Sequence, residues 1–308
     1  MILVVNLNPS LDKIYEIKQL QYGKAMRVEQ MQNTAGGKGS HVASVINSLG
    51  EDCTVVGFLG GFIGAFIGDA LKEKGIINEM TQIEAPTRSC LNIATGDGQQ
   101  TEFLEPGPWI TQDEQARFLL TYKRLLAEAD LVVASGSLPQ NLPVSFYRDL
   151  IELANAAGKR FLLDTSGAPF VEGIKAKPFF VKPNKDEIEA FSGKKMDSIE
   201  AAIAQLHELQ ALGIKMPGIS LGAEGAIVGT ADTVYHALPP KMEVINAVGS
   251  GDAYVAGLAV GLNRNLTDAE SVRLAAACGT ANVCERESGF VRVEQVERLK
   301  SRIMIRSL

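Results

Sequence analysis

The stretch DLVVASGSLPQNLPVSFYRDLIELANAAGKRFLLD, residues 130–164, contains a strand pattern, a helical pattern and a second strand pattern in direct succession. The apolar run Asp130–Ala134 predicts a buried strand. Pro143–Ala157 has the apolar spacing of a helix that ends at Gly158, and Arg160–Leu163 predicts the next strand. A strand, a helix and a strand in this order are typical of parallel strands joined by a crossover helix.

The same alternation extends in both directions along the chain. Upstream, Ile2–Leu7 predicts a buried strand, and Lys38–Leu49 predicts a helix that ends at Gly50. Downstream, Pro178–Val181 predicts another short strand. We therefore expect an α/β fold in which helices cover both faces of a mostly parallel sheet.

Two regions, 11–34 and 77–105, interrupt the alternation. They contain strand-like runs, among them Arg88–Ala94 and Gln100–Leu104, without long helices between them. We expect these segments to form a small antiparallel sheet that is inserted into the α/β body and acts as a lid. The chain, residues 1–308, is then a single domain with an inserted lid.

The C-terminal part of the chain differs from the central part. Here we expect a few antiparallel strands followed by three helices. The strands are Pro217–Leu221, Ala226–Gly229 and Thr233–Leu238, and the helices cover 251–263, 267–285 and 293–303.

The composition limits the classes of partner. The chain has 308 residues, of which 46% are hydrophobic and 21% are charged, values that exclude a disordered chain. The chain has 30 Lys and Arg residues and 36 Asp and Glu residues. The resulting net charge of −6 disfavours binding to nucleic acid or to an anionic membrane surface. An anionic substrate would therefore need local positive charge.

The cysteines and the N-terminus favour a cytoplasmic protein. Four cysteines without a C-x-x-C pair do not form a disulfide framework, and the three histidines lack metal-ligand spacing. The N-terminal residues lack the features of a signal peptide. The uncharged run Cys53–Gly68 is shorter than the roughly 20 residues of a membrane span, so we interpret it as a buried strand, Thr54–Leu59, and a packed helix.

The segment GSGDAYVAG, Gly249–Gly257, carries the strongest chemical signal. Two glycines before an apolar helix can direct several backbone N–H groups into one concavity that suits a phosphoryl group. Asp252 at the helix start is then able to accept a proton from an attacking hydroxyl group. Alternatively, Asp252 is only a helix N-cap and the glycines form only a turn. The chain contains neither a P-loop nor a complete G-x-G-x-x-G motif.

A second glycine cluster, Gly36-Gly37-Lys38-Gly39-Ser40-His41, precedes the first predicted helix. It allows a ligand to approach the backbone, with Lys38 as a donor, or it is a tight turn with a solvated lysine. Asp12 follows the first strand, where open α/β sheets place ligands, and a carboxylate there can bind paired sugar hydroxyls; otherwise it is a turn residue.

Three further motifs each have a structural and a functional interpretation. Arg88 in the predicted lid suits a phosphate, although a lone surface arginine is usually just solvated. Asn184 and Glu187 have the spacing of a helix capping box, and the functional alternative places Glu187 near Mg²⁺ and its waters. The segment Ser220–Gly225 is a strand end with a glycine turn that suits the edge of a nucleotide.

Taken together, these motifs resemble those of the PfkB family of ribokinase-like, ATP-dependent carbohydrate kinases. The resemblance extends along the whole chain, and it is greatest to the tagatose-6-phosphate kinase and 1-phosphofructokinase branch. The matching strings, in order, are Asn8–Asp12, Gly36–Lys38, Thr87–Arg88, Gly136–Pro139, Asp164–Gly167, Lys182–Glu187, Ser220–Gly225 and Gly249–Asp252. The resemblance implies a three-layer α/β/α body with a β-sheet lid.

The resemblance also implies a role for each matching residue. Asp252 matches the catalytic base, and Gly249, Ser250, Gly251 and the Asp252 backbone match the anion hole, with Ser250 replacing the more usual Ala. The ATP-binding positions are Lys182, Asn184, Ser220, Gly222, Gly225, Gly249 and Gly251, and the Mg²⁺ positions are Asn184 and Glu187, acting through water. The sugar-phosphate positions are Asp12, Gly36, Gly37, Lys38, Arg88 and Ser137.

His41 departs from the family pattern, because an Asn usually stands at this position and helps to hold the substrate. The implied reaction is the phosphorylation of tagatose 6-phosphate or fructose 1-phosphate by Mg²⁺-ATP, and the implied assembly is a homodimer through the lid. Two alternatives stay open: a kinase of an unphosphorylated sugar or a nucleoside, and a non-catalytic sensor of nucleotide or sugar phosphate.

Overall fold

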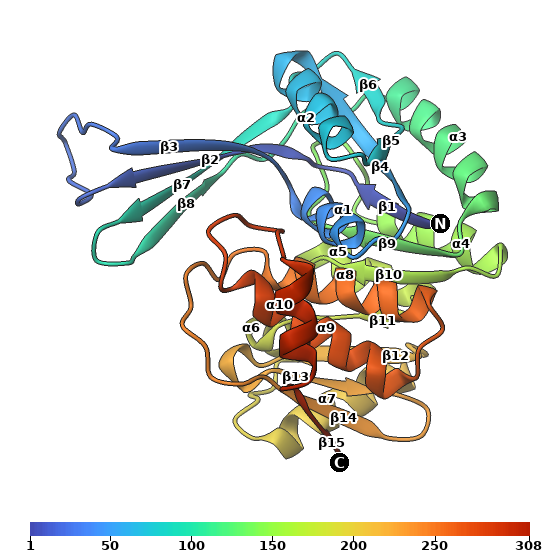
Figure 1. Ribbon diagram of the computed structural model, residues 1–308. Coiled ribbons are helices and arrows are strands. Elements are labelled where there is room, and N and C mark those ends of the chain that lie inside the picture. The colour runs from blue at the N-terminus through green and yellow to red at the C-terminus, as the bar shows by residue number, and fades with distance from the viewer.

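An eleven-stranded sheet runs through the body of the protein in the computed structural model, which describes residues 1–308 (Figure 1). The strand order is β15-β14-β13-β12-β11-β10-β9-β1-β4-β5, and β6 also pairs with β4. The parallel strands are β1 (Ile2–Asn6), β4 (Cys53–Gly60), β5 (Ile77–Asn78), β6 (Thr81–Ile83), β9 (Leu131–Ser135), β10 (Arg160–Asp164), β11 (Phe180–Val181) and β12 (Met216–Ser220). The antiparallel strands are β13 (Ala226–Gly229), β14 (Val234–Leu238) and β15 (Met304–Ser307).

Helices cover both faces of this sheet, which confirms the expected layers. One face is covered by α1 (Lys38–Ser48), α2 (Gly61–Glu73), α8 (Ser250–Asn263), α9 (Asp268–Asn282) and α10 (Val293–Lys300). The other face is covered by α3 (Gln112–Glu128), α4 (Phe146–Ala156), α5 (Gly167–Gly173), α6 (Lys185–Ser192) and α7 (Ile199–Ala211), and two 3₁₀ turns span Ile174–Ala176 and Gly222–Glu224.

The strand sequences explain why both faces are covered. In β1, Ile2 and Val4 belong to one hydrophobic core, whereas Leu3 and Val5 belong to the other. Successive side chains of a strand point to opposite faces, so a continuous apolar run fills two cores. The edge strand β15 was missed, because Met304–Ser307 is short and mostly exposed, and the sequence predicted a helix up to residue 303.

The lid is a separate four-stranded sheet that projects from the body (Figure 1). Its order is β3-β2-β7-β8, and its strands are β2 (Ser10–Ile17), β3 (Gln30–Gly36), β7 (Arg88–Thr95) and β8 (Gln100–Leu104). The expectation of a purely antiparallel sheet was wrong, because the central pair β2 and β7 is parallel. Strand β2 forms one hairpin with β3, and β7 forms a second hairpin with β8. Both hairpins leave the body in the same direction and pair side by side, so their first strands are parallel.

The segment 77–105 does not belong to the lid as a whole. Ile77–Asn78 and Thr81–Ile83 pair with β4 and extend the edge of the main sheet. Both pairings are parallel continuations of the α/β body after α2, so the lid insertion begins only at Arg88.

The uncharged run Cys53–Gly68 forms β4 and the first half of α2, as expected. Close packing explains its glycines: a Cβ atom at Gly57 would lie 1.8 Å from the Asn6 carbonyl oxygen. None of the helices combines the length and the apolar character that a transmembrane span requires.

Candidate active site

The carboxyl ends of the parallel strands bring the predicted site residues to one edge of the sheet. The chain passes from β1 to β4 on one side and later places β9 on the other side of β1, so the strand order reverses between β1 and β9. Open α/β sheets bind ligands at such a point. Asp12 follows β1, Ser137 follows β9, Lys182 follows β11, Ser220 ends β12, and Asp164 ends β10.

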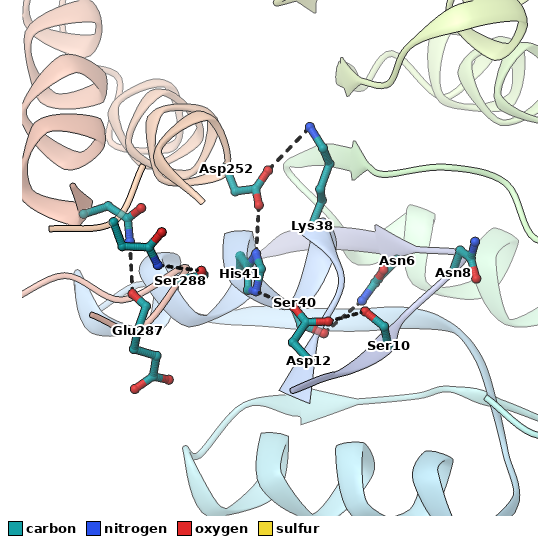
Figure 2. A network of polar contacts seen from close by, with 12 residues as sticks. Asn6, Asn8, Ser10, Asp12, Lys38, Ser40, His41, Asp252, Glu287 and Ser288 are labelled. Carbon is teal, nitrogen blue, oxygen red and sulfur yellow. Dashed lines mark hydrogen bonds and ion pairs between the residues drawn. The ribbon is translucent and has the colours of Figure 1, made fainter. Parts of the chain in front are cut away.

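Asp252 lies in the first turn of α8, in contact with α1 (Figure 2). Its side chain is buried, with Oδ2 2.9 Å from Nδ1 of His41 and Oδ1 3.8 Å from Nζ of Lys38. The alternative that Asp252 is an N-cap is excluded, because Gly249 occupies the cap position and no side chain caps the helix. The carboxylate is therefore directed to the site.

The backbone before Asp252 is shaped by glycine. Gly249 has a φ of 86°, in the left-handed region, and a Cβ atom there would lie 2.6 Å from the backbone nitrogen of Gly289. The N–H groups of the first helical turn have no partner within the helix, and the helix dipole adds partial positive charge. Gly249, Ser250, Gly251 and the Asp252 backbone therefore form the start of a helix that suits an anion.

Asp164 joins the two sides of the site, although sequence reasoning did not place it there. Its Oδ2 lies 3.0 Å from Nζ of Lys38 and accepts a hydrogen bond from Ser135 Oγ at 3.1 Å, and its Oδ1 lies 3.9 Å from Nζ of Lys182. The signal for finding it was present, because a carboxylate at the carboxyl end of a strand was the argument used for Asp12.

These contacts determine the charge states of the cluster. Burial acts to raise the pKa of Asp164, but Lys38 and Lys182 outweigh it and lower the pKa to about 2. The pKa of Lys38 is raised, mainly by Asp164, against the effect of burial. Lys38 is thus a paired cation with a half-exposed side chain, which argues against a merely solvated lysine.

Asp12 lies over the glycine cluster at the start of α1. A Cβ atom at Gly36 would lie 2.0 Å from Cγ of Asp12, so only glycine leaves room for this carboxylate. Gly37 is the N-cap of α1, with a φ of 85°. Ser10 Oγ donates to Asp12 Oδ1 at 2.6 Å, and Nε2 of His41 lies 3.4 Å from Asp12 Oδ2.

Arg88 begins β7 at the base of the lid, and its guanidinium donates to backbone carbonyl oxygens rather than to carboxylates. The acceptors are Asn8, at 3.0 and 3.3 Å, and Glu105, at 2.7 Å. The nearby Ser137 Oγ accepts a hydrogen bond of 3.0 Å from Asn8 Nδ2. Arg88 therefore offers positive charge that no carboxylate contact neutralises.

The predicted nucleotide positions lie along β11, β12 and α6. Lys182 is buried, and its Nζ lies 3.4 Å from where a Cβ atom of Gly251 would be, so it reaches the N-terminus of α8. Ser220 forms a parallel bridge with Asn184. Gly222 begins the 3₁₀ turn and Gly225 follows it, with φ values of 60° and 84°, a geometry that favours glycine.

Asn184 and Glu187 form a capping box on α6. Asn184 Oδ1 accepts from the Glu187 N–H at 2.9 Å, and Glu187 Oε2 accepts from the Asn184 N–H at 2.8 Å. The structural interpretation of this motif is therefore confirmed. No group of three or more His, Cys, Asp or Glu residues is arranged to hold a metal ion. Asn184 and Glu187 carry oxygen atoms, the ligand type that Mg²⁺ prefers.

Comparison with known proteins gives one consistent result. The chain matches the pfkB family carbohydrate kinases over residues 5–294. A “putative phosphofructokinase” from Staphylococcus aureus is 31% identical, with a TM-score of 0.87, over 100% of this chain and 99% of that one. A “possible 1-phosphofructokinase” from Thermotoga maritima is 25% identical, with a TM-score of 0.91, over 100% and 99% of the two chains.

The ribokinase of Arabidopsis thaliana, solved with ribose and ATP, is 22% identical and has a TM-score of 0.81, with 97% of this chain and 98% of that one covered. This last likeness concerns the fold alone, which is the ribokinase-like three-layer α/β fold with a smaller separate sheet. From the extent of the family match, the chain belongs to the pfkB family of carbohydrate kinases.

Proposed function

We propose that this protein is an ATP-dependent ketohexose-phosphate kinase that converts tagatose 6-phosphate or fructose 1-phosphate to the bisphosphate. The observation that carries the proposal is the buried carboxylate of Asp252 in the first turn of α8, beside backbone N–H groups that suit an anion. A sugar kinase needs both features together, whereas a sensor has no need of a base. The phosphofructokinase names of the similar structures support a phosphorylated ketohexose as the substrate class.

In the proposed reaction, Asp252 accepts the proton of a primary hydroxyl group of the sugar. The hydroxyl oxygen bonds to the γ-phosphorus of ATP while the bond to the bridging β-phosphate oxygen breaks, which gives ADP. The first turn of α8, with Lys182 beside it, offsets the charge on the transferring phosphoryl oxygens. General base catalysis of this kind contributes about 10²–10⁴-fold to the rate.

The sugar phosphate occupies the side of the site that is formed by β1, α1 and the lid. Asp12 accepts hydrogen bonds from sugar hydroxyls, and Gly36, Gly37 and Ser137 line the same region. Arg88 and Lys38 supply the local positive charge for the phosphate that the sugar already carries. Of the two, Arg88 is the freer cation, because Lys38 also contacts Asp164 and Asp252.

ATP occupies the side formed by Lys182, Asn184 and the Ser220–Gly225 segment. Asn184 and Glu187 would hold Mg²⁺ through water, and the ion would supply charge neutralisation at the nucleotide phosphates. Glu187 keeps one carboxylate oxygen outside the capping box for this contact. In this proposal the lid and the body act as a single kinase domain, and the lid excludes water from the transfer.

The proposal is tested by coupled ADP release with Mg²⁺-ATP, comparing tagatose 6-phosphate, fructose 1-phosphate, fructose 6-phosphate and free fructose by kcat/KM. We expect a strong preference for one of the first two. Activity only on unphosphorylated sugars would overturn the roles of Lys38 and Arg88. Absence of turnover across the panel, with ATP still bound, would favour the sensor.

Asp252→Asn tests the base directly. We expect kcat to fall by about 10²–10⁴-fold while the KM values change little, because the amide keeps the shape of the carboxylate but cannot accept the proton. Steady-state kinetics and ATP binding by calorimetry measure the two effects separately. Turnover close to that of the wild type would remove Asp252 from the mechanism.

We also propose that the protein forms a homodimer through the lid. Strand register places Tyr15, Met31 and Ile93 on one face of the lid, together with Leu91 and Phe103, and this face points away from Asp12. Met31 and Phe103 are 62% and 56% exposed. A second copy that packs its own lid on this face would cover these side chains.

A further inference from the structure

A buried imidazole lies between two carboxylates that belong to different parts of the proposed reaction. His41 is 7% exposed; its Nδ1 is 2.9 Å from Oδ2 of Asp252, and its Nε2 is 3.4 Å from Oδ2 of Asp12. Figure 2 shows the ring between these side chains, with Asp252 in α8 on one side and Asp12 in β2 on the other. One side chain thus connects the proposed base to the proposed sugar-binding residue.

The surrounding backbone holds this ring in place. His41 lies in the first turn of α1 and Asp252 in the first turn of α8, so the contact between them brings the N-terminal turns of the two helices together. The segment after α9 closes over the ring: a Cβ atom at Gly289, which has a φ of 66°, would lie 2.4 Å from Cβ of His41. The Gly289 backbone therefore packs against the base of the His41 side chain, and only glycine leaves room for it there.

The contacts also define the protonation state of the ring. A carboxylate is an acceptor, and only the imidazolium form has an N–H at both ring nitrogens. Burial acts to lower the pKa of His41, but the hydrogen bonds and charges of Asp12 and Asp252 outweigh it and raise the pKa to about 9. Lys38, on the same helix as His41, contacts Asp252 and Asp164. The segment after α9 places the Gly289 backbone against His41, and its charged residues before Gly289 are Glu285, Arg286 and Glu287.

We propose that His41 is a positioning residue that donates a hydrogen bond to Asp252, forms an ion pair with Asp12, and so determines which oxygen of Asp252 receives the substrate proton. With Oδ2 held by the imidazolium, Oδ1 is left on the side of Lys38, where it takes the proton of the sugar hydroxyl. His41 keeps both of its protons throughout the transfer. This inference rests on the proposed kinase function and extends it to a residue at which the chain differs from its family.

The ring also couples the base to the sugar side of the site. Ser10 holds one oxygen of Asp12 and His41 approaches the other, so the orientation of Asp12 depends on the same ring that orients Asp252. An Asn at position 41 is shorter and uncharged. It lacks the two ring N–H groups with which His41 faces one carboxylate on each side. His41 therefore gives this chain a connection that the more usual residue does not provide.

The kinetic test compares the wild type with His41→Asn and His41→Gln between pH 6 and pH 10. The raised pKa means that the imidazolium is complete at neutral pH and is lost as the pH rises through about 9. We expect the wild-type kcat to fall in that range. The variants should have a kcat lower by about 10–100-fold at pH 7.5, little change in the KM for ATP, and no decline near pH 9.

His207→Asn is the matched control, because His207 is exposed on α7 and its ring is hydrogen-bonded to Gln210, a residue outside the proposed site. It should retain the kcat and the pH profile of the wild type. If His41→Asn and His41→Gln also retain both, the inference is wrong while the kinase function stands. If the wild type phosphorylates no sugar phosphate, the proposed function fails, and a measurement without turnover then tests the placement of His41.

That measurement is nitrogen-detected NMR of the three imidazoles, with the His41 signals assigned as those that persist in both His207→Asn and His236→Asn. We expect both nitrogens of His41 to carry protons at pH 7 and to titrate near pH 9, and we expect Asp252→Asn to move this titration to lower pH. A neutral His41 at pH 7, or a titration unaffected by Asp252→Asn, would overturn the inference even if the His41 variants fail to fold.

Discussion

Gly36 shows how a single missing side chain shapes the substrate side of the site. The Asp12 carboxyl atoms lie 2.0–2.3 Å from the place that a Cβ atom of Gly36 would occupy. Gly36 has no left-handed φ, so this requirement comes from the close approach of Asp12 and not from backbone strain.

Gly36→Ala should therefore displace Asp12 and weaken sugar binding. We expect the KM for the sugar phosphate to rise by about tenfold, with a smaller change in the KM for ATP, since an error of about 1 Å at a positioned group is costly. Steady-state kinetics with each substrate varied in turn measures the difference.

Gly68→Ala on α2 is the control, because its Cβ atom would lie 3.7 Å from Leu59 Cδ1, an ordinary contact. It should retain both KM values. Equal effects of Gly36→Ala on the two KM values would show that the substitution disturbs the site as a whole and would contradict a specific contact with Asp12.

At the level of elements, α6 combines a structural motif with a proposed role in metal binding. The capping box between Asn184 and Glu187 is complete, so both residues stabilise the helix whether or not they act on Mg²⁺. A useful substitution must keep the cap and remove the charge. Glutamine does this, because its side-chain oxygen can accept the same backbone hydrogen bond.

Glu187→Gln should leave the thermal stability unchanged and weaken the response to Mg²⁺. We expect the Mg²⁺ concentration at half-maximal rate to rise by about tenfold, because the water-mediated contact loses its charge. Asn184→Ala should instead lower the stability by about 1 kcal/mol through loss of the cap. Thermal unfolding and Mg²⁺ titration of the rate measure these effects.

Glu270→Gln changes the same capping position in α9, where Thr267 is the N-cap. This control should retain the Mg²⁺ response of the wild type. If Glu187→Gln also retains it, Glu187 serves only as a cap, and the proposed metal contact is wrong.

At the level of the whole molecule, the lid provides the clearest test of assembly. Phe103 and Leu104 are adjacent on β8, and both are exposed, at 56% and 68%. They point to opposite faces of the lid, because successive residues of a strand alternate. Only Phe103 belongs to the face that is proposed to pair with a second copy.

Phe103→Asp should therefore dissociate the dimer, because it places a charge in an apolar interface. Light scattering on a sizing column should show the wild type at twice the chain mass of 33.0 kDa and the variant at that mass. Leu104→Asp should stay dimeric. A monomeric wild type at micromolar concentration, or dissociation of both variants, would contradict the proposed interface.

Much of the fold follows from local patterns. Ile2–Asn6 and Leu131–Ser135 are strands because their apolar runs fill both cores, and α4 ends where Gly158 follows it. The prediction that the lid is an antiparallel sheet was wrong for the pair β2 and β7, since the direction of two hairpins relative to each other depends on where both leave the body.

The candidate site likewise has a part that the local sequence predicts and a part that it does not. The glycine turn before Asp252 could be located from its own residues, because the need for glycine and the start of a helix are local properties. The partner of the Asp252 carboxylate could not be located in this way, because His41 lies 211 positions away in the sequence. The same holds for the ion pair of Lys38 and Asp164, which are 126 positions apart. Local sequence specifies backbone conformation and burial over a few residues. Contacts between distant residues exist only after the strands have assembled into a sheet. The charge states of His41 and Asp164 depend on such contacts and are therefore properties of the folded chain alone.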